Sequence, residues 1–149
     1  MNSHHGILLV EDSDDDALLT ARAFKEARIS NPMVRVENGV EALDYLFAKG
    51  KHAARDPREL PAVVLLDLNL PRLNGLDVLK AIRSDERTKS LPVVILTSSS
   101  EERDRLAAYD QYANSYIQKP VDYDQFVSAA GQLGLYWIVL NLPVPRVDA

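Results

Sequence analysis

The sequence predicts a single α/β domain in which helices cover both faces of a doubly wound parallel sheet. Short aliphatic runs recur along the chain, and segments whose apolar residues have helical spacing follow them. Most of these runs end at a polar residue, and the kind of polar residue differs from one run to the next. The crossovers between runs are long enough for parallel strands, which need about a dozen residues. We therefore assign residues 1–149 to one domain.

The composition excludes several classes of protein. Hydrophobic residues make up 46% of the chain and charged residues 26%, which is typical of a soluble globular protein. The absence of Cys excludes disulfides and thiolate metal sites. A net charge of −5 disfavours nonspecific binding to nucleic acid or anionic lipid. Because residues 1–5 do not resemble a signal peptide and no apolar run reaches the roughly 18 residues of a membrane span, we expect a cytoplasmic protein.

The run 63–66 is the central strand of the predicted sheet. It is apolar without a break, as in a parallel strand buried on both faces, and it ends at Asp67. Open α/β sheets place their ligand crevices at such strand ends. A single aspartate in this place could equally cap a turn, since Asn69 and Pro71 end the strand. The residues at the ends of the other strands help to decide between a ligand site and a turn cap.

The first strand, 7–10, is followed by the acidic run 11–16 and then by a helix with apolar residues at Ala17, Leu18, Ala21 and Phe24. Ser13 can cap this helix, and the aspartates after it favour the positive end of the helix dipole. Capping does not account for Glu11 and Asp12, because both precede the cap.

The second strand, 33–36, leads to a helix that Asn38 opens, with an apolar face of Val40, Leu43, Leu46 and Phe47. The polar and basic segment 48–61 then exceeds the usual link of about 2 to 6 residues between a helix and a strand. This segment is either a partner surface or a slack, solvated loop.

The C-terminal half repeats the alternation. Gly75 permits a tight entry into a helix with Leu76, Leu79 and Ile82 inward, and the strand 92–97 follows. Ser98 with Glu101, or Ser99 with Glu102, could form a capping box, whereas Thr97 precedes both. A helix through 106–110, a strand at 115–118 that Lys119 follows directly, and a last helix from about 122 complete the pattern.

The strand ends of a parallel sheet lie on one edge, so Glu11, Asp12, Asp67, Thr97 and Lys119 are expected to converge. Carboxylates this close repel one another unless a cation intervenes, and oxygen ligands without Cys point to Mg²⁺. A hydroxyl and an ammonium beside them would neutralise a transferring phosphoryl group. The pattern therefore predicts phosphoryl transfer with Asp67 as the nucleophile.

Over residues 7–130 the chain resembles the receiver domain of two-component response regulators. The resemblance implies a flavodoxin-like fold with a five-stranded sheet in the order 2-1-3-4-5. It implies that Asp67 takes a phosphoryl group from a phosphohistidine of a sensor histidine kinase. Asp12 would ligate Mg²⁺ directly, Glu11 would act largely through a bound water, and the backbone carbonyl of Asn69 would complete the set.

The same resemblance assigns the switch of the domain. Thr97 would hydrogen-bond the phosphoryl group, Lys119 would pair with it, and Tyr116 would rotate inward as Thr97 moves. The protein would then signal by altered binding to other proteins, and it would catalyse only its own phosphorylation and dephosphorylation. The motifs ILLVEDSDDD, LLDLNLPRLNG, VVILTSSSEERD and ANSYIQKPVD, with the long 49–61 insertion, are further similar to the single-domain regulators of bacterial phytochrome kinases.

Two other functions fit part of this pattern. A Mg²⁺-dependent phosphohydrolase with an aspartyl-phosphate intermediate also uses an Asp at a strand end and a Lys. Asn69 stands where such an enzyme would have its acid/base carboxylate, and no segment resembles a substrate-recognising cap. A receiver-like module that is never phosphorylated is disfavoured, because every acceptor-site residue is present.

The C-terminal extension, 131–149, is predicted to form a homodimer contact. Residues 135–140 are apolar without a break, so a helix there would be apolar on all sides. Dimer cores use large side chains of the kind found at Tyr136, Trp137, Ile138 and Leu142. The alternative is that the extension continues the core of its own domain.

Overall fold

The computed structural model describes residues 6–29, 31–68, 70–97, 115–118, 124, 127–128 and 131, without the side chains of residues 97 and 115–118. In chain order the elements are β1 (Ile7–Val10), α1 (Asp14–Glu26), β2 (Met33–Val36), α2 (Gly39–Phe47), the 3-10 helix η2 (Gly50–His52), β3 (Val63–Asp67), α3 (Gly75–Ser84), β4 (Val93–Thr97) and β5 (Ser115–Gln118).

The strands form one parallel sheet in the order β2-β1-β3-β4-β5. In the register of the two central strands, Val10 lies opposite Leu66, so β1 and β3 end side by side. The predicted parallel α/β class is confirmed. All neighbouring strands run the same way, and their carboxyl ends therefore meet at one edge of the sheet.

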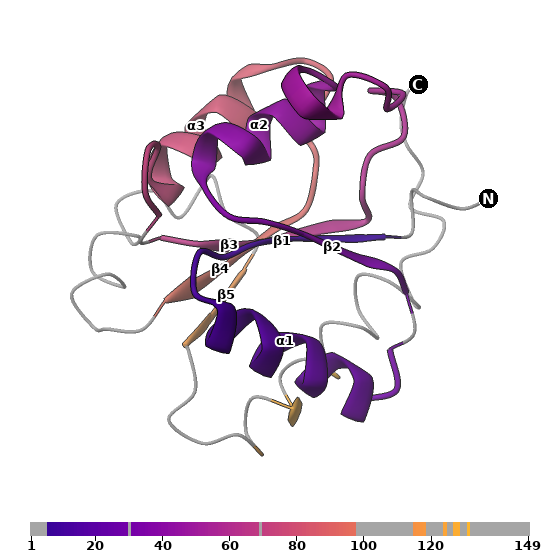
Figure 1. Ribbon diagram of the computed structural model, residues 1–149, viewed down its shortest axis with the longest axis vertical. Coiled ribbons are helices and arrows are strands. Elements are labelled where there is room, and N and C mark those ends of the chain that lie inside the picture. Colours follow the sequence, from indigo (N-terminus) through magenta and orange to yellow (C-terminus); the bar gives the residue numbers. More distant parts are fainter. Residues whose placement is uncertain are drawn as a thin grey trace.

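Helices lie on both faces of the sheet, with α1 on one side and α2 and α3 on the other (Figure 1). Leu8 and Val10 pack in the core on the side of α2 and α3, whereas Ile7 and Leu9 pack with Phe24 in the core under α1. All four residues of β1 are buried, as are all five of β3. Burial on both faces explains why these strands are apolar without alternation.

Short polar side chains begin the helices. The Ser13 hydroxyl accepts a hydrogen bond from the backbone N–H of Asp16 at 3.1 Å, which confirms the predicted cap of α1. Asn38 and Asn74 cap α2 and α3 through the same i to i+3 contact.

The predicted apolar stripe of α1 is partly wrong. Leu18 is 60% exposed and Ala21 is also exposed, while the buried face consists of Ala17, Thr20, Ala23 and Phe24. Thr20 can be buried because its hydroxyl donates to the carbonyl of Asp16 at 2.9 Å. Local satisfaction of a polar group therefore lets the helix turn a different face toward the sheet.

The segment 48–61 is attached to α2. Glu41 accepts hydrogen bonds from Lys51 at 3.0 Å and His52 at 3.2 Å. The Arg55 guanidinium lies 3.9 Å from the centre of the Tyr45 ring, a cation–π contact. These contacts fix the segment against α2, so it is not a slack loop, and its use as a partner surface stays untested.

Two further expectations concern the rest of the chain. Residues 124, 127, 128 and 131 are helical, as expected for part of the last helix, whereas the segments 106–110 and 132–149 lie outside the described residues. None of the helices in the described part of the chain combines the length and the apolar character that crossing a membrane requires.

Candidate metal centre

Three carboxylates gather at the carboxyl edge of the sheet. Glu11, Asp12 and Asp67 each offer one oxygen, and these oxygens all lie within 4.8 Å of one another. Glu11 and Asp67 are buried, whereas Asp12 is exposed. The parallel pairing of β1 with β3 produces this cluster, because Glu11 directly follows Val10 and Asp67 directly follows its partner Leu66.

Backbone hydrogen bonds hold both strand ends in place. The N–H of Glu11 donates to the carbonyl of Val36 at 3.0 Å, which extends the pairing of β1 with β2. The backbone N–H of Ser13 donates to Glu11 Oε2 at 3.3 Å. Beyond Asp67, the N–H of Leu68 donates to the carbonyl of Leu96 at 3.3 Å. Glu11 and Asp67 therefore project from strand ends that hydrogen bonds to the neighbouring strands β2 and β4 fix.

The donor set fits a hard divalent cation. It consists only of carboxylate oxygens, which suit Mg²⁺, Ca²⁺ or Mn²⁺ better than metals that prefer nitrogen or sulfur. Like charges at this separation repel one another, and burial of two of the groups strengthens the repulsion. A bound cation would relieve this repulsion, so Glu11, Asp12 and Asp67 are the residues that could hold it.

The other predicted site residues are described only in part. Thr97 ends β4, where its neighbour Leu96 pairs with Asp67, so its backbone lies at the same edge as the cluster. The backbone of Tyr116 in β5 pairs with Ile95. The side chains of both residues are outside the described part of the chain, as are Asn69 and Lys119 entirely. Tyr136, Trp137, Ile138 and Leu142 are also outside it.

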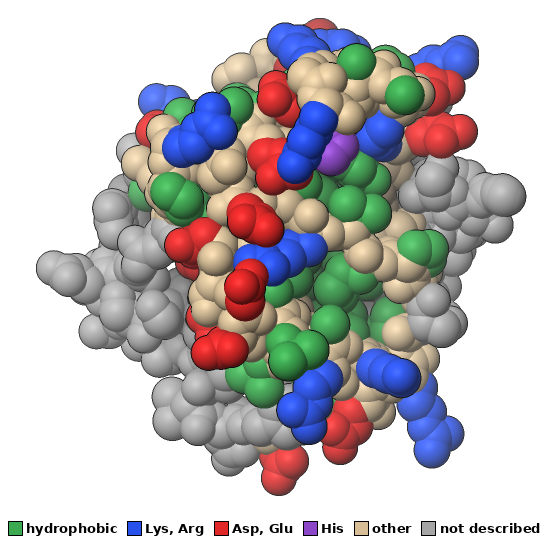
Figure 2. Space-filling model, viewed as in Figure 1, with side chains coloured by type: hydrophobic (Ala, Val, Ile, Leu, Met, Phe, Trp, Pro, Cys, Tyr) green, Lys and Arg blue, Asp and Glu red, His purple; other side chains and the backbone are tan. Residues whose placement is uncertain are grey.

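The structure adds Arg35 of β2 to the surroundings of the cluster. Its Nε donates to the carbonyl of Glu11 at 2.9 Å, and its Nη1 donates to Asp14 Oδ1 at 2.8 Å. Sequence reasoning missed this residue. The sequence does contain a signal that could have indicated it. Arg35 is the single charged residue in the apolar strand MVRV, and the segment 11–16 after the neighbouring strand is strongly acidic. Acidic and basic side chains are indeed interleaved on the face shown in Figure 2.

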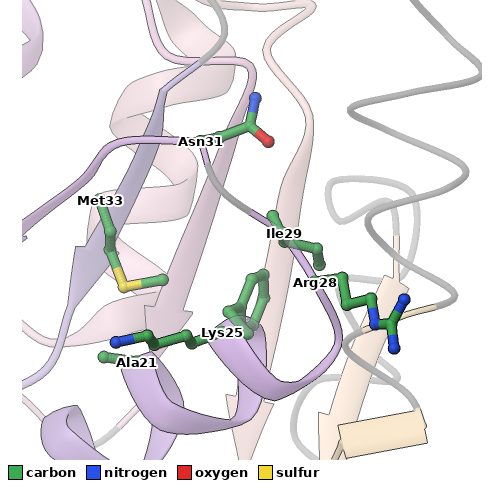
Figure 3. A pocket seen from close by; sticks show the side chains of 7 residues that line it. Ala21, Lys25, Arg28, Ile29, Asn31 and Met33 are labelled. Atoms are coloured by element: carbon green, nitrogen blue, oxygen red, sulfur yellow. The ribbon is translucent and has the colours of Figure 1, made fainter.

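A hollow of about 380 Å³ lies elsewhere, between the end of α1 and the beginning of β2. It is lined by Ala21, Phe24, Lys25, Arg28, Ile29, Asn31 and Met33 (Figure 3). Met33 is the first residue of β2, so the hollow opens at the amino edge of the sheet, opposite the carboxylates. It is therefore separate from the candidate metal centre.

Comparison with known families gives one match that spans most of the chain. The family model described as the response regulator receiver domain matches residues 7–131. The match begins at the first residue of β1 and includes all three carboxylates of the cluster.

Three similar proteins have names that refer to response regulators. Response regulator Rcp1 from Synechocystis sp. is 33% identical over 138 residues, which are 92% of each protein. A Mn²⁺-bound structure of Rcp1 has a TM-score of 0.77 at 30% sequence identity, and the match covers 97% of this chain and 99% of that one. The bacteriophytochrome response regulator RtBRR is 48% identical with a TM-score of 0.79, over 94% of this chain and 84% of that one. The phosphorylated cyanobacterial phytochrome response regulator RcpA is 34% identical with a TM-score of 0.79, over 98% and 99%.

Proposed function

Because the chain belongs to the response regulator receiver family, as its match over residues 7–131 shows, we propose that Asp67 is the residue that accepts the phosphoryl group. The protein is a phosphoacceptor of two-component signalling with the flavodoxin-like receiver fold. A single domain with its core at about 7–130 is part of the proposal.

One observation carries the assignment of Asp67. Its carboxylate stands within 4.8 Å of those of Glu11 and Asp12, at the carboxyl edge of a parallel sheet. A structural aspartate would need only a local hydrogen-bond partner, whereas a cluster of three carboxylates is costly without a cation. The family match supports this receiver function over the phosphohydrolase alternative.

The proposed chemistry is a simple displacement. A carboxylate oxygen of Asp67 forms a bond to phosphorus as the P–N bond of the donor phosphohistidine breaks. The electron pair of that bond leaves with the imidazole nitrogen, and the product is an aspartyl phosphate. Asp67 is buried at the end of a rigid strand, so its carboxylate is oriented before the donor arrives.

We assign the cation to Mg²⁺, held by Glu11, Asp12, Asp67 and the backbone carbonyl of Asn69. When bound, it would neutralise the oxygens of the phosphoryl group and the carboxylates around it. The oxygen-only donor set supports this assignment, and so does the Mn²⁺-bound structure of Rcp1, since Mn²⁺ and Mg²⁺ share oxygen ligands.

The remaining site residues would serve the switch. Thr97 would hydrogen-bond the phosphoryl group, Lys119 would pair with its charge, and Tyr116 would respond to the movement of Thr97. The backbone of Thr97 directly follows Leu96, which pairs with Asp67, and this position supports a contact of Thr97 with the phosphoryl group. Lys119 directly follows β5 in the sequence, which would bring it to the same edge.

The proposed kinase is a sensor histidine kinase of the phytochrome type. RtBRR and RcpA are named as response regulators of a bacteriophytochrome and of a cyanobacterial phytochrome, and both are similar to this chain over nearly its whole length. The output would be altered binding to another protein, with no nucleic acid or membrane as partner and a location in the cytoplasm. The net charge of −5 supports the absence of nonspecific nucleic-acid binding.

We also propose a homodimer. The extension 131–149 would supply the contact through Tyr136, Trp137, Ile138 and Leu142. The run of large apolar residues in this extension supports an interface, because such residues form the cores of dimer contacts.

Incubation with acetyl phosphate, followed by mass spectrometry of the intact protein, tests the central proposal. The wild type is expected to gain one phosphoryl group in the presence of Mg²⁺ and none after chelation. Asp67→Asn is expected to gain none, whereas Asp77→Asn, which changes an exposed carboxylate of α3, behaves as the wild type. Uptake by Asp67→Asn at the wild-type level would overturn the assignment. Steady turnover of a phosphomonoester would favour the phosphohydrolase instead.

A further inference from the structure

Arg35 connects the edge strand β2 to the turn that holds two of the three carboxylates. Its Nε donates to the backbone carbonyl of Glu11 at 2.9 Å. From the same planar group, Nη1 donates to the carboxylate of Asp14 at 2.8 Å. Glu11 is in the cluster, and Asp14 is the first residue of α1. One side chain therefore spans the turn from its first residue to its last.

The turn is closed from inside as well. The backbone N–H of Ser13 donates to Glu11 Oε2, and the Ser13 hydroxyl accepts from the N–H of Asp16. Asp12 lies between these two sets of contacts. Its two neighbours are fixed, because Arg35 holds the carbonyl of Glu11 and the backbone N–H of Ser13 is bound to the Glu11 carboxylate, whereas the Asp12 side chain is exposed.

The partial burial of the Arg35 side chain, which is 26% exposed, is difficult to explain by stability alone. Its Nη2 is buried and has no hydrogen-bond partner among the described residues, which costs free energy. Its ionic partner Asp14 is 89% exposed, and exposed ion pairs contribute little to stability. A guanidinium held at such cost beside a functional turn suggests that its position serves the turn. The rigid fork of Arg, which Lys lacks, is suited to bind two acceptors at once.

We propose that Arg35 is a positioning residue of the divalent cation site. It acts on the cation only through Glu11 and Asp12, whose backbone it holds in the conformation that brings their carboxylates to Asp67. This inference rests on the proposed function, because it presumes that the cluster binds a cation. Groups that orient metal ligands typically change metal affinity by about tenfold or more when they are removed.

A second effect of Arg35 opposes the first, and the two can be separated. Its positive charge repels a cation, so removing the charge would by itself tighten binding. Arg35→Lys keeps the charge but cannot make both hydrogen bonds, whereas Arg35→Met loses both the charge and the bonds. A positioning role weakens binding in both variants. If Arg35 acted through its charge alone, Arg35→Lys would bind Mg²⁺ with unchanged affinity and Arg35→Met would bind Mg²⁺ more tightly.

Calorimetric titration with Mg²⁺ alone tests the proposal on the full chain. We expect the dissociation constant to rise about tenfold in Arg35→Lys, and to rise by a smaller factor in Arg35→Met, where loss of the positive charge offsets part of the effect. Arg58→Met is the matched control, because it removes an arginine from an exposed ion pair with Asp56 in the 48–61 loop. Thermal melting of each variant by circular dichroism shows that it is folded, and Arg35→Lys is the milder change should Arg35→Met not fold.

Phosphorylation by acetyl phosphate at increasing Mg²⁺ gives a second readout. The Arg35 variants are expected to need more Mg²⁺ for half-maximal rate and to reach the wild-type rate at saturation. Unchanged Mg²⁺ affinity in Arg35→Lys, or tighter binding in Arg35→Met, would overturn the role of Arg35. A lower rate at saturation would also overturn it, because Arg35 would then act on the phosphoryl group itself. Failure of the wild type to bind Mg²⁺ would instead overturn the proposed function.

Discussion

Gly75 lies against the backbone of Asp67, where a side chain would not fit. A β-carbon at Gly75 would stand 2.3 Å from the carbonyl oxygen of Asp67 and 2.7 Å from the α-carbon of Leu68. The N–H of Gly75 also donates to the carbonyl of Leu68 at 3.1 Å. The start of α3 is thus packed directly on the end of the strand that presents Asp67, the proposed phosphoacceptor.

Gly75→Ala is therefore expected to destabilise the fold by about 1 to 3 kcal/mol, as overpacking of a tight contact does. It should also slow phosphorylation, because relief of the clash moves the backbone of Asp67. Urea denaturation and uptake from acetyl phosphate measure the two effects. Gly131→Ala is the control, since its β-carbon would meet Ala27 at an ordinary 3.7 Å. Equal stability of the Gly75→Ala variant and the wild type would contradict this account.

The attachment of the 48–61 loop to α2 is expected to weaken in acid. Burial of Glu41 raises its pKa, but the hydrogen bonds from Lys51, from the backbone of Glu37 and from His52 outweigh burial, and the pKa lies below its ordinary value of 4.5. Because the folded-state pKa is lowered, the stabilisation is complete above pH 4.5 and is lost as the pH falls through the folded-state value.

Hydrogen exchange of the amides of residues 49–55, followed from pH 6 down to pH 3, measures this loss against the intrinsic rates. Glu41→Gln should show weaker protection at pH 6 and no additional loss in acid. Protection in the wild type that does not change over this range would refute the role of Glu41.

Thr97→Ala and Lys119→Ala are expected to separate phosphorylation from the switch. Each residue would bias a two-state equilibrium only through its contact with the phosphoryl group. Both variants should still take up some phosphate by mass, while the phosphate-induced NMR shifts of residues 101–110 become much smaller than in the wild type. Phosphate-induced shifts of equal size in Thr97→Ala and in the wild type would contradict the proposed role of Thr97 in the switch.

The dimer proposal predicts that the wild type sediments as a dimer at micromolar concentration. Replacing both Trp137 and Ile138 with Asp should give a folded monomer, because two charges would have to be desolvated at the apolar contact. Replacing Leu18 with Asp, at an exposed position of α1, is the matched control and should leave the dimer intact. A monomeric wild type, or a double variant that stays dimeric, would show that the extension serves its own core.

The residue pattern alone was sufficient for the buried strands and for the carboxylates of the site, whereas the strand order was expected only from the family resemblance. Unbroken apolar runs occur where a strand is buried on both faces, so β1 and β3 could be recognised from their own residues. Parallel strands end at one edge, so the sequence predicts that Glu11, Asp12 and Asp67 lie close together, as they do. The capping role of Ser13 also depends only on neighbouring residues.

Tertiary structure decided the features that depend on contacts between distant segments. Arg35 reaches the carbonyl of Glu11 across 24 positions of sequence, and only the register of β2 on β1 brings the two together. The buried face of α1 depends on how that helix is rotated on the sheet, which left Leu18 outside the core. The closeness of Gly75 to Asp67 depends on where α3 docks. Local patterns record which residues are buried, but register, rotation and docking arise from the packing of whole elements against one another.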